Sequence, residues 1–333
     1  MGKSTTPIFK DKNGIRIKDS VAYIRSIYIQ GNKQWILVRG RSINKPILLF
    51  LHGGPGVTTI GFIRKLQKQL EQHFICVNWD QRGAGKSYDK KVFNDQLTIN
   101  DFVEDIHVLT RYLVEKYNTQ KIILVGSSWG SIIGSMAAQR YPELFHAYIG
   151  IGQVVNMMEG ERISYEFALE SAKNESNEEA ITELESIGFS PSENFKYLLI
   201  QRKWLKHYGG VFRDQKLLDL IFNKYLTNSY EYKKSDMMKL TKGNIESHKY
   251  LWDQMLKVNF LDNLTTFSLP TYYCVGRYDY NTPSSLMEKY YEVIQSPKKD
   301  IFWFEESAHG INFEEPKKFL EICLRIKKEC EII

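Results

Sequence analysis

One stretch, IILVGSSWGS at residues 122–131, restricts the possible folds of this chain more than any other feature. Its aliphatic first half predicts a buried strand, and apolar residues at helical spacing resume from Ser131. Between them, Gly126-x-Ser128-x-Gly130 has the strand–turn–helix context that exposes a nucleophilic serine at a helix N-terminus, where the helix dipole favours a developing anion. A chemically inert turn rich in glycine and serine is the alternative, because the short pattern is common by chance.

Strand and helix patterns alternate on both sides of this stretch. Apolar runs predict strands at residues 21–29, 34–38, 46–51, 74–79, 122–127, 147–151, 271–275 and 300–304. Apolar residues at helical spacing predict helices at residues 62–70, 100–117, 131–140, 284–294 and 315–327. This alternation favours an α/β fold with a mostly parallel, eight-stranded sheet that is flanked by helices.

The pattern changes between residues 154 and 264, where no strand is predicted. Amphipathic helices are predicted there instead, at residues 163–172, 178–187, 193–206, 216–225 and 245–258. We therefore expect three parts: the first part of an α/β core at residues 1–153, a helical insertion at 154–264, and the second part of the core at 265–333.

Composition and charge exclude several classes of protein. The net charge of +6 comes from 45 basic and 39 acidic residues that are spread along the 333 residues, without a basic block interleaved with aromatic residues. A nucleic-acid partner is therefore not expected. No apolar run approaches the roughly 20 residues of a membrane-spanning helix, so a membrane partner is not expected either.

Cysteine usage is typical of a reducing compartment. Cys76 and Cys274 lie in predicted buried strands, and these two, Cys323 and Cys330 lack the spacing of a metal site. The first residues contain no apolar segment typical of a signal peptide. We therefore expect a cytoplasmic protein that uses no metal ion and no other cofactor, and the sequence leaves its oligomeric state open.

The other members of an acyl-transfer site follow from chain order. A serine at such a turn needs an acid and then a histidine later in the chain, each directly after a strand. Asp279 follows the strand predicted to end at Val275, and His309 follows the strand predicted to end at Phe304. The other histidines fall in predicted helices, near strand starts or in a glycine-rich loop, and a turn or capping role is the alternative for Asp279.

Two backbone N–H groups are expected to hold the oxyanion. One belongs to Trp129, directly after Ser128, and the other belongs to Gly54 in the HGGPG loop at residues 52–56. His52 in the same loop is expected to brace it.

A phosphate-loop pattern is rejected. The sequence GAGKS at residues 83–87 ends like a phosphate-binding loop, but the required first glycine would fall at Asp80. No helix is predicted to open at Lys86, so the sequence does not predict nucleotide binding.

Five motifs together resemble α/β-hydrolases of the proline iminopeptidase type. They are HGGPG at residues 52–56, DQRGxGxS at 80–87, GxSWGS at 126–131, GxxD at 276–279 and the loop that holds His309. The resemblance covers residues 46–148 and 269–319. It implies a cofactor-free serine hydrolase in which the insertion forms a cap over the active site, and in which Gly54 and Trp129 supply the oxyanion donors.

The resemblance implies an aminopeptidase that acts through an acyl-enzyme and releases N-terminal proline or another small residue from short peptides. Members of this family hold the substrate amine with acidic cap residues. The candidates here are Glu159, Glu161, Glu166, Glu170 and Glu246, and Glu159, Glu166 and Glu246 are preferred. These acids are not matched residue by residue. A carboxylesterase or lactonase for a small apolar substrate is therefore the alternative, and a non-catalytic binding relative is a third, more remote one.

Overall fold

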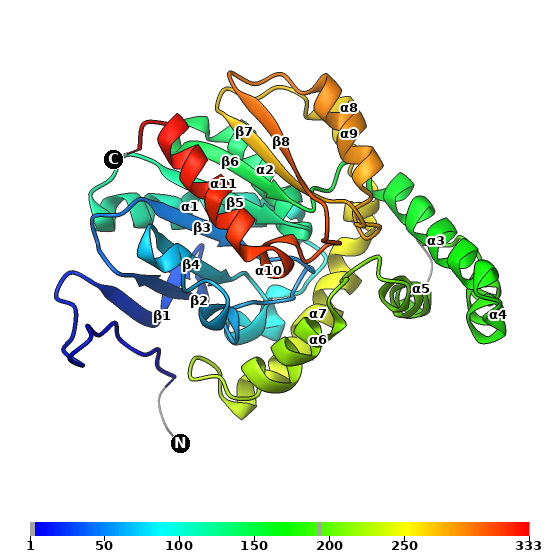
Figure 1. Cartoon of the computed structure of the whole chain (residues 1–333), viewed down its shortest axis with the longest axis horizontal. Coiled ribbons are helices and arrows are strands. Elements are labelled where there is room, and N and C mark those ends of the chain that lie inside the picture. Colours follow the sequence, from blue (N-terminus) through cyan, green and yellow to red (C-terminus); the bar gives the residue numbers. More distant parts are fainter. Residues whose placement is uncertain (1–3, 192–194, 333) are drawn as a thin grey trace.

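A central β-sheet organises the computed structural model, which describes residues 4–191 and 195–332 (Figure 1). Within these residues the sheet has eight strands in the order β1-β2-β4-β3-β5-β6-β7-β8. They are β1 (Val21–Ile29), β2 (Asn32–Gly40), β3 (Ile47–Leu51), β4 (Ile75–Asp80), β5 (Ile122–Ser127), β6 (Phe145–Ile151), β7 (Thr271–Gly276) and β8 (Lys299–Phe304). The β1–β2 and β2–β4 pairs are antiparallel and the other neighbours are parallel, which confirms the predicted sheet.

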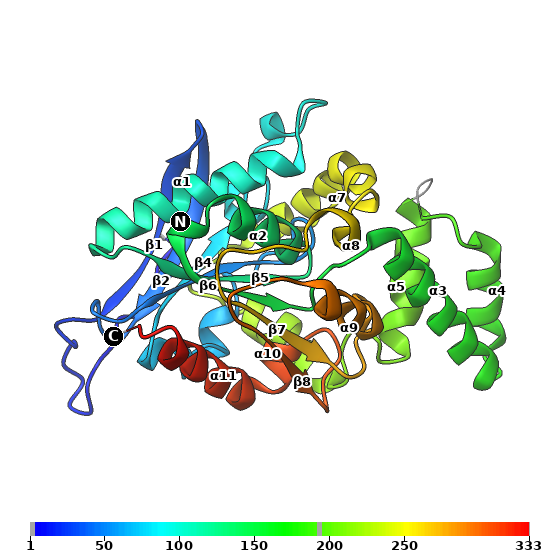
Figure 2. The same ribbon diagram turned by 90° about the horizontal axis from the view of Figure 1, so that it is seen from above.

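Helices cover both faces of the sheet (Figure 2). The helices of the core are α1 (Ile99–Tyr117), α2 (Trp129–Arg140), α9 (Ser284–Val293), α10 (Ile311–Glu314) and α11 (Pro316–Glu329). One face packs against α1, α2 and α9, and the opposite face packs against α11. Because successive strand residues point to opposite faces, Leu124 of β5 joins the first layer and Val125 joins the second.

One predicted helix of the core is wrong. Residues 62–70 lead into two short 3-10 turns, Ile63–Lys65 and Leu70–Gln72, instead of forming one α-helix. Ile63 and Gln67 are both buried within this segment. Packing against the core therefore sets the path of the chain here more strongly than the local helical spacing of apolar residues.

The chain between β6 and β7 forms helices (Figure 1). They are α3 (Met157–Asn174), α4 (Glu178–Ile187), α5 (Phe195–His207), α6 (Gln215–Asp219), a π-helical turn (Leu220–Leu226), α7 (Lys234–Leu256) and α8 (Phe260–Asn263). We call residues 154–264 the insertion. In both views α3, α4 and α5 stand together to one side of the sheet (Figure 2). Across the described residues, no helix combines the length and apolarity needed to cross a lipid bilayer.

Several helices of the insertion differ from the sequence-based boundaries: α3 begins at Met157 rather than at residue 163, and the helix predicted at 216–225 is divided into α6 and the π-helical turn. The predicted start of α5 at Glu193 lies outside the described residues. Helix α7 begins at Lys234 rather than at residue 245, because its first turns are held by polar contacts that apolar spacing does not reveal. The Asp236 carboxylate accepts the backbone N–H of Lys233 at 2.9 Å and so caps this helix.

Buried polar contacts fix the insertion to the core beside the end of β4. The Tyr232 hydroxyl donates to Asp80 Oδ2 at 2.5 Å, and the backbone N–H of Lys86 donates to the same oxygen at 2.8 Å. The Lys86 ammonium pairs with Asp236 at 2.7 Å. All four side chains are buried. The lysine of the sequence that resembles a phosphate loop therefore joins the insertion to the core.

Burial gives Asp80 an unusual titration. It raises the pKa of this carboxyl to about 7, from about 3.9 in an unfolded chain. The folded protein therefore holds the Asp80 proton more tightly, and the resulting stabilisation is present below about pH 4 and lost as the pH rises through about 7. We expect the free energy of unfolding of the Asp80→Asn variant to fall less steeply with rising pH than that of the wild-type protein. Urea titrations at several pH values in this range measure it.

The exposed Asp95 provides the matched control for this measurement. The Asp95→Asn variant removes one carboxyl from the exposed segment between β4 and α1 and should keep the wild-type pH dependence. If the unfolding free energies of the wild-type protein and the Asp80→Asn variant changed equally with pH, Asp80 would not titrate in this pH range.

Candidate active site

The turn between β5 and α2 holds Ser128 in an unusual backbone conformation, with φ 55° and ψ −123°. Glycines on both sides allow the chain to turn this tightly. A Cβ atom added at Gly126 would lie 2.5 Å from the carbonyl oxygen of Gly130, and one added at Gly130 would lie 2.2 Å from that of Leu51. The predicted glycine–serine–glycine pattern is therefore a requirement of close backbone packing at this site.

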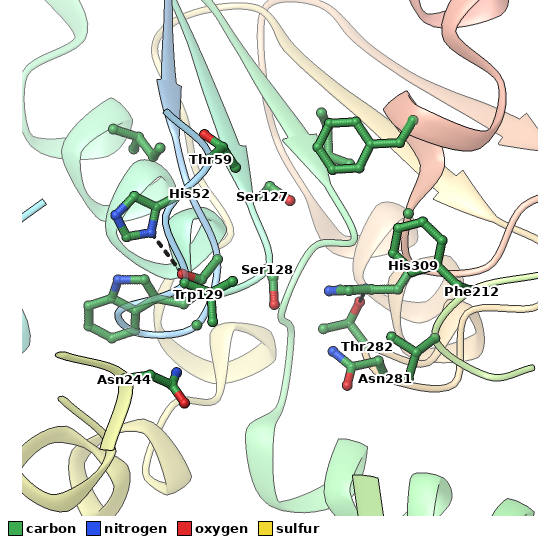
Figure 3. Close-up of a pocket in the computed structure, with 18 of the residues that line it drawn as sticks. His52, Thr59, Ser127, Ser128, Trp129, Phe212, Asn244, Asn281, Thr282 and His309 are labelled. Atoms are coloured by element: carbon green, nitrogen blue, oxygen red, sulfur yellow. Dashed lines mark hydrogen bonds between the residues drawn. The ribbon is translucent and has the colours of Figure 1, made fainter. Parts of the chain in front are cut away.

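Asp279 and His309 meet beside this turn. Asp279 follows β7 and is 2% exposed, and its Oδ2 atom accepts a hydrogen bond from His309 Nδ1 at 2.8 Å. The Oδ1 atom accepts the backbone N–H groups of Asn281 and Thr282, each at 2.9 Å. Because the carboxylate accepts from Nδ1, the ring presents Nε2 to the cavity, and Figure 3 shows the ring of His309 directed toward Ser128.

The two predicted oxyanion donors lie in the same cavity as Ser128. Trp129 is the first residue of α2, and the first N–H groups of a helix have no partner within it. The loop that holds Gly54 approaches Ser128 closely, because a Cβ atom added at the preceding Gly53 would lie 3.1 Å from Ser128 Cβ. Both N–H groups therefore belong to backbone that is packed around the serine.

A buried hydrogen-bond network braces this loop. His52 Nδ1 donates to the carbonyl oxygen of Gly53 at 2.8 Å, and its Nε2 accepts the backbone N–H of Gln81 at 3.2 Å. The Gln81 side chain donates to the His52 carbonyl oxygen at 3.0 Å and accepts the Trp129 indole N–H at 2.8 Å. Burial lowers the pKa of His52 to about 4, so this ring is neutral at pH 7 and holds the loop without a charge.

A loop of the insertion also contacts the histidine segment. The backbone N–H of His309 donates to the carbonyl oxygen of Val211 at 3.0 Å, and that of Tyr280 donates to Gly210 at 3.1 Å.

The Thr282 hydroxyl, which was not predicted from the sequence, donates to Asp279 Oδ2 at 2.9 Å. The sequence could have indicated the Thr282 contact only through its spacing, three residues after Asp279. The contacts of Val211 and Gly210 join distant parts of the chain and have no such local signal.

The cavity next to Ser128 has a volume of about 600 Å³ and is lined mainly by apolar side chains. Both the core and the insertion contribute, with Phe62, Leu198, Phe212, Ile221, Trp252 and Phe313 as examples. The described lining residues include two formal charges, on Arg202 and Lys206, and neither an aspartate nor a glutamate. The described residues also contain no cluster of histidine, cysteine and acidic side chains suited to a metal ion.

None of the acids predicted to hold a substrate amine, including the three preferred ones, lines this cavity. Glu159 and Glu166 pair with Arg162 at 2.6 and 2.5 Å on a half-exposed face of α3. Glu246 lies on α7, whose lining residues include Asn244 and His248. Side chains two positions apart on a helix point in nearly opposite directions, so Glu246 faces away from the cavity.

Comparisons with known proteins support the motif-based resemblance. The family described as alpha/beta hydrolase fold matches residues 46–316. A probable aminopeptidase from Bacillus subtilis (strain 168), YbaC, is 34% identical over 304 residues, which cover 91% of this chain and 95% of that protein. A proline iminopeptidase from Heyndrickxia coagulans is 23% identical, with 83% of this chain and 88% of that protein covered.

A solved structure agrees with the fold. The crystal structure of the proline iminopeptidase from Mycobacterium smegmatis superposes with a TM-score of 0.62 at 15% sequence identity. The superposition covers 93% of this chain and 99% of that one. The predicted fold and the predicted resemblance are thus confirmed, and a structural likeness at this identity speaks for the fold alone.

The tight packing around Gly130 leads to a prediction about stability. An added Cβ atom would lie 2.2 Å from the Leu51 carbonyl oxygen, a backbone atom that cannot move without disturbing β3. We expect the Gly130→Ala variant to lose about 3 kcal/mol or more of unfolding free energy, or to fail to fold. Chemical denaturation measures this loss.

Gly160 in α3 is the matched control, because the nearest atom to its added Cβ would be Pro283 Cδ at 3.6 Å. The Gly160→Ala variant should be more stable than the wild-type protein by about 0.5–1 kcal/mol, since alanine favours a helix interior. A Gly130→Ala variant as stable as the wild-type protein would contradict the argument from backbone packing.

Proposed function

We propose that Ser128, Asp279 and His309 form the catalytic triad of a serine hydrolase. The premise is that the chain belongs to the alpha/beta hydrolase family. The observation that carries this proposal is the 2.8 Å hydrogen bond between His309 Nδ1 and Asp279, with the ring directed toward Ser128 (Figure 3). A histidine that is held by a carboxylate and faces a serine can take the proton of the hydroxyl and so activate it as a nucleophile.

The proposed reaction proceeds in two steps. His309 Nε2 takes the proton of Ser128 as Oγ attacks the substrate carbonyl, and the resulting oxyanion accepts the N–H groups of Gly54 and Trp129. His309 then protonates the leaving group, which departs and leaves an acyl-enzyme on Ser128. Water, deprotonated by His309, hydrolyses this ester. Asp279 stabilises the imidazolium in both steps, and each oxyanion donor is expected to lower the barrier by roughly 3 kcal/mol.

We propose that the substrate is a short peptide and that the enzyme is an aminopeptidase that releases N-terminal proline or another small residue. The name of the Bacillus subtilis relative, a probable aminopeptidase at 34% identity over nearly the whole chain, supports this substrate class. The apolar lining of the cavity suits an apolar residue, and its volume of about 600 Å³ has room for a short peptide.

A carboxylesterase or lactonase is the second candidate, and one specific observation favours it. No aspartate or glutamate is found among the described residues that line the cavity, so a protonated substrate amine would meet only neutral acceptors there. An amine in such a site is bound less tightly than one paired with a carboxylate.

We further propose that residues 154–264 act as a cap over a core formed by residues 1–153 and 265–333. Side chains of α5 and α7 line the cavity opposite the strand ends, which supports this division. A cytoplasmic location is also proposed, since Cys76, Cys274 and Cys323 are buried free thiols, as expected in a reducing compartment.

The triad is tested by replacing the nucleophile. The Ser128→Ala variant should lose turnover by on the order of 10³-fold or more, because the acyl-enzyme cannot form. It should also lose covalent labelling by a fluorophosphonate probe. The neighbouring Ser127→Ala variant controls for a change in the local fold and should still be labelled. Undiminished labelling of the Ser128→Ala variant would exclude Ser128 as the nucleophile.

The substrate class is tested by blocking the amine. We expect a prolyl arylamide to be cleaved, and its N-acetylated form to be cleaved at least about 10-fold less efficiently, because an aminopeptidase requires the free amine. A short-chain aryl ester without an amine is assayed in parallel. Equal kcat/KM values for the free and acetylated arylamides, together with rapid ester cleavage, would favour the esterase over the peptidase.

A further inference from the structure

One face of α5 brings positive charge to the cavity. Leu198, Leu199, Arg202 and Lys206 all line it, and positions four apart lie on the same face of a helix. Among the lining residues that the structure describes, Arg202 and Lys206 carry the only charges from lysine, arginine, aspartate or glutamate side chains. The α5 side of the cavity is therefore basic, whereas most of the remaining wall is apolar.

Arg202 is held in place by buried partners. Its Nη1 atom donates to Glu161 Oε2 at 3.0 Å, Nη2 donates to Glu161 Oε1, and Nη1 also donates to the side-chain oxygen of Gln201. Glu161 is 1% exposed and Gln201 is fully buried, whereas the Arg202 side chain keeps 29% of its surface exposed. Burying a carboxylate is costly for stability, so this pair indicates that the position of the guanidinium matters.

The guanidinium retains donors for a ligand. It has five N–H groups, and three of them are used by Glu161 and Gln201. The Nε–H group and one Nη2–H group have no partner among the described residues. Glu161 balances the charge of Arg202, but the fixed orientation of the guanidinium remains suited to a planar acceptor such as a carboxylate.

Lys206 supplies the excess charge at this end of the cavity. It is exposed and forms no ion pair within the described part of the chain. Burial lowers the pKa of His248, which also lines the cavity, and so disfavours a positive charge on this ring. By contrast, Lys203 on the same helix is paired with Glu179 at 3.0 Å and with Glu183 at 2.9 Å and does not line the cavity.

We propose that Arg202 and Lys206 form a subsite for a carboxylate that the substrate carries away from the scissile bond. Such a carboxylate is present at the C-terminus of a free dipeptide or tripeptide, and also on a monoester of a dicarboxylic acid. This inference rests on the proposed hydrolase function and narrows its substrate class to small molecules that are apolar near the scissile carbonyl and anionic at the far end.

The test uses pairs of substrates that differ only in this carboxylate. The first pair is a prolyl dipeptide and its C-terminal amide. The second is the para-nitrophenyl monoester of adipic acid and para-nitrophenyl hexanoate. In at least one pair, the wild-type enzyme should prefer the carboxylated member by about 10-fold or more in kcat/KM, mainly through a lower KM, since charge-assisted hydrogen bonds reach this size. The pair that shows the preference identifies which source of carboxylate the subsite takes.

Variants then test whether Arg202 and Lys206 cause this preference for the carboxylated substrate. Lys206→Gln removes an exposed charge and should reduce the preference several-fold. The double variant Glu161→Gln/Arg202→Gln removes the buried pair together, so that no charge is left unpaired, and should also reduce the preference several-fold, because the oriented N–H donors are lost while Lys206 remains. Lys203→Gln is the matched control: it removes the same charge from the same helix outside the cavity and should keep the wild-type preference.

Two outcomes would overturn the inference. One is an equal kcat/KM for both members of each pair in the wild-type enzyme. The other is a preference that both the Lys206→Gln and the double variant retain in full. A failure of the proposed function looks different, because turnover would then be absent for all four substrates or would persist in the Ser128→Ala variant.

Discussion

The contact between the first turn of α2 and the ends of β3 and β5 is the constraint on which this site depends. Gly126 and Gly130 let three stretches of backbone approach each other so closely that no side chain fits between them. The same contact accompanies the positive φ of Ser128, and Trp129 and Gly54 both line the cavity beside it. The proposed nucleophile and both proposed oxyanion donors therefore depend on one packing arrangement of the main chain.

Much of the fold was predictable because strands and chain order are local features. All eight predicted strands are present in the described part of the molecule, and the predicted Asp279 and His309 lie within hydrogen-bond distance of each other. Parallel strands end at one edge of a sheet, so residues directly after them meet without any knowledge of their side-chain contacts. The catalytic role of these residues stays a prediction.

The insertion was harder to predict, because what matters there is which face of each helix points inward. Glu159 and Glu166 were chosen by residue type, yet both pair with Arg162 outside the cavity. The buried acid of α3 is Glu161, whose partner Arg202 lies on another helix 41 positions away in the chain. The contact of Asp80 with Tyr232 spans 152 positions and leaves no trace in local spacing.

The loop after α5 connects the insertion to the proposed base, His309, through backbone hydrogen bonds. The backbone N–H of His309 donates a hydrogen bond to Val211, and that of Tyr280, next to Asp279, donates one to Gly210. Helix α5, which also carries Arg202, ends at His207, only a few residues before Val211. The wall of the cavity that carries Arg202 and the main chain of the proposed base therefore share one short segment of backbone, residues 208–211.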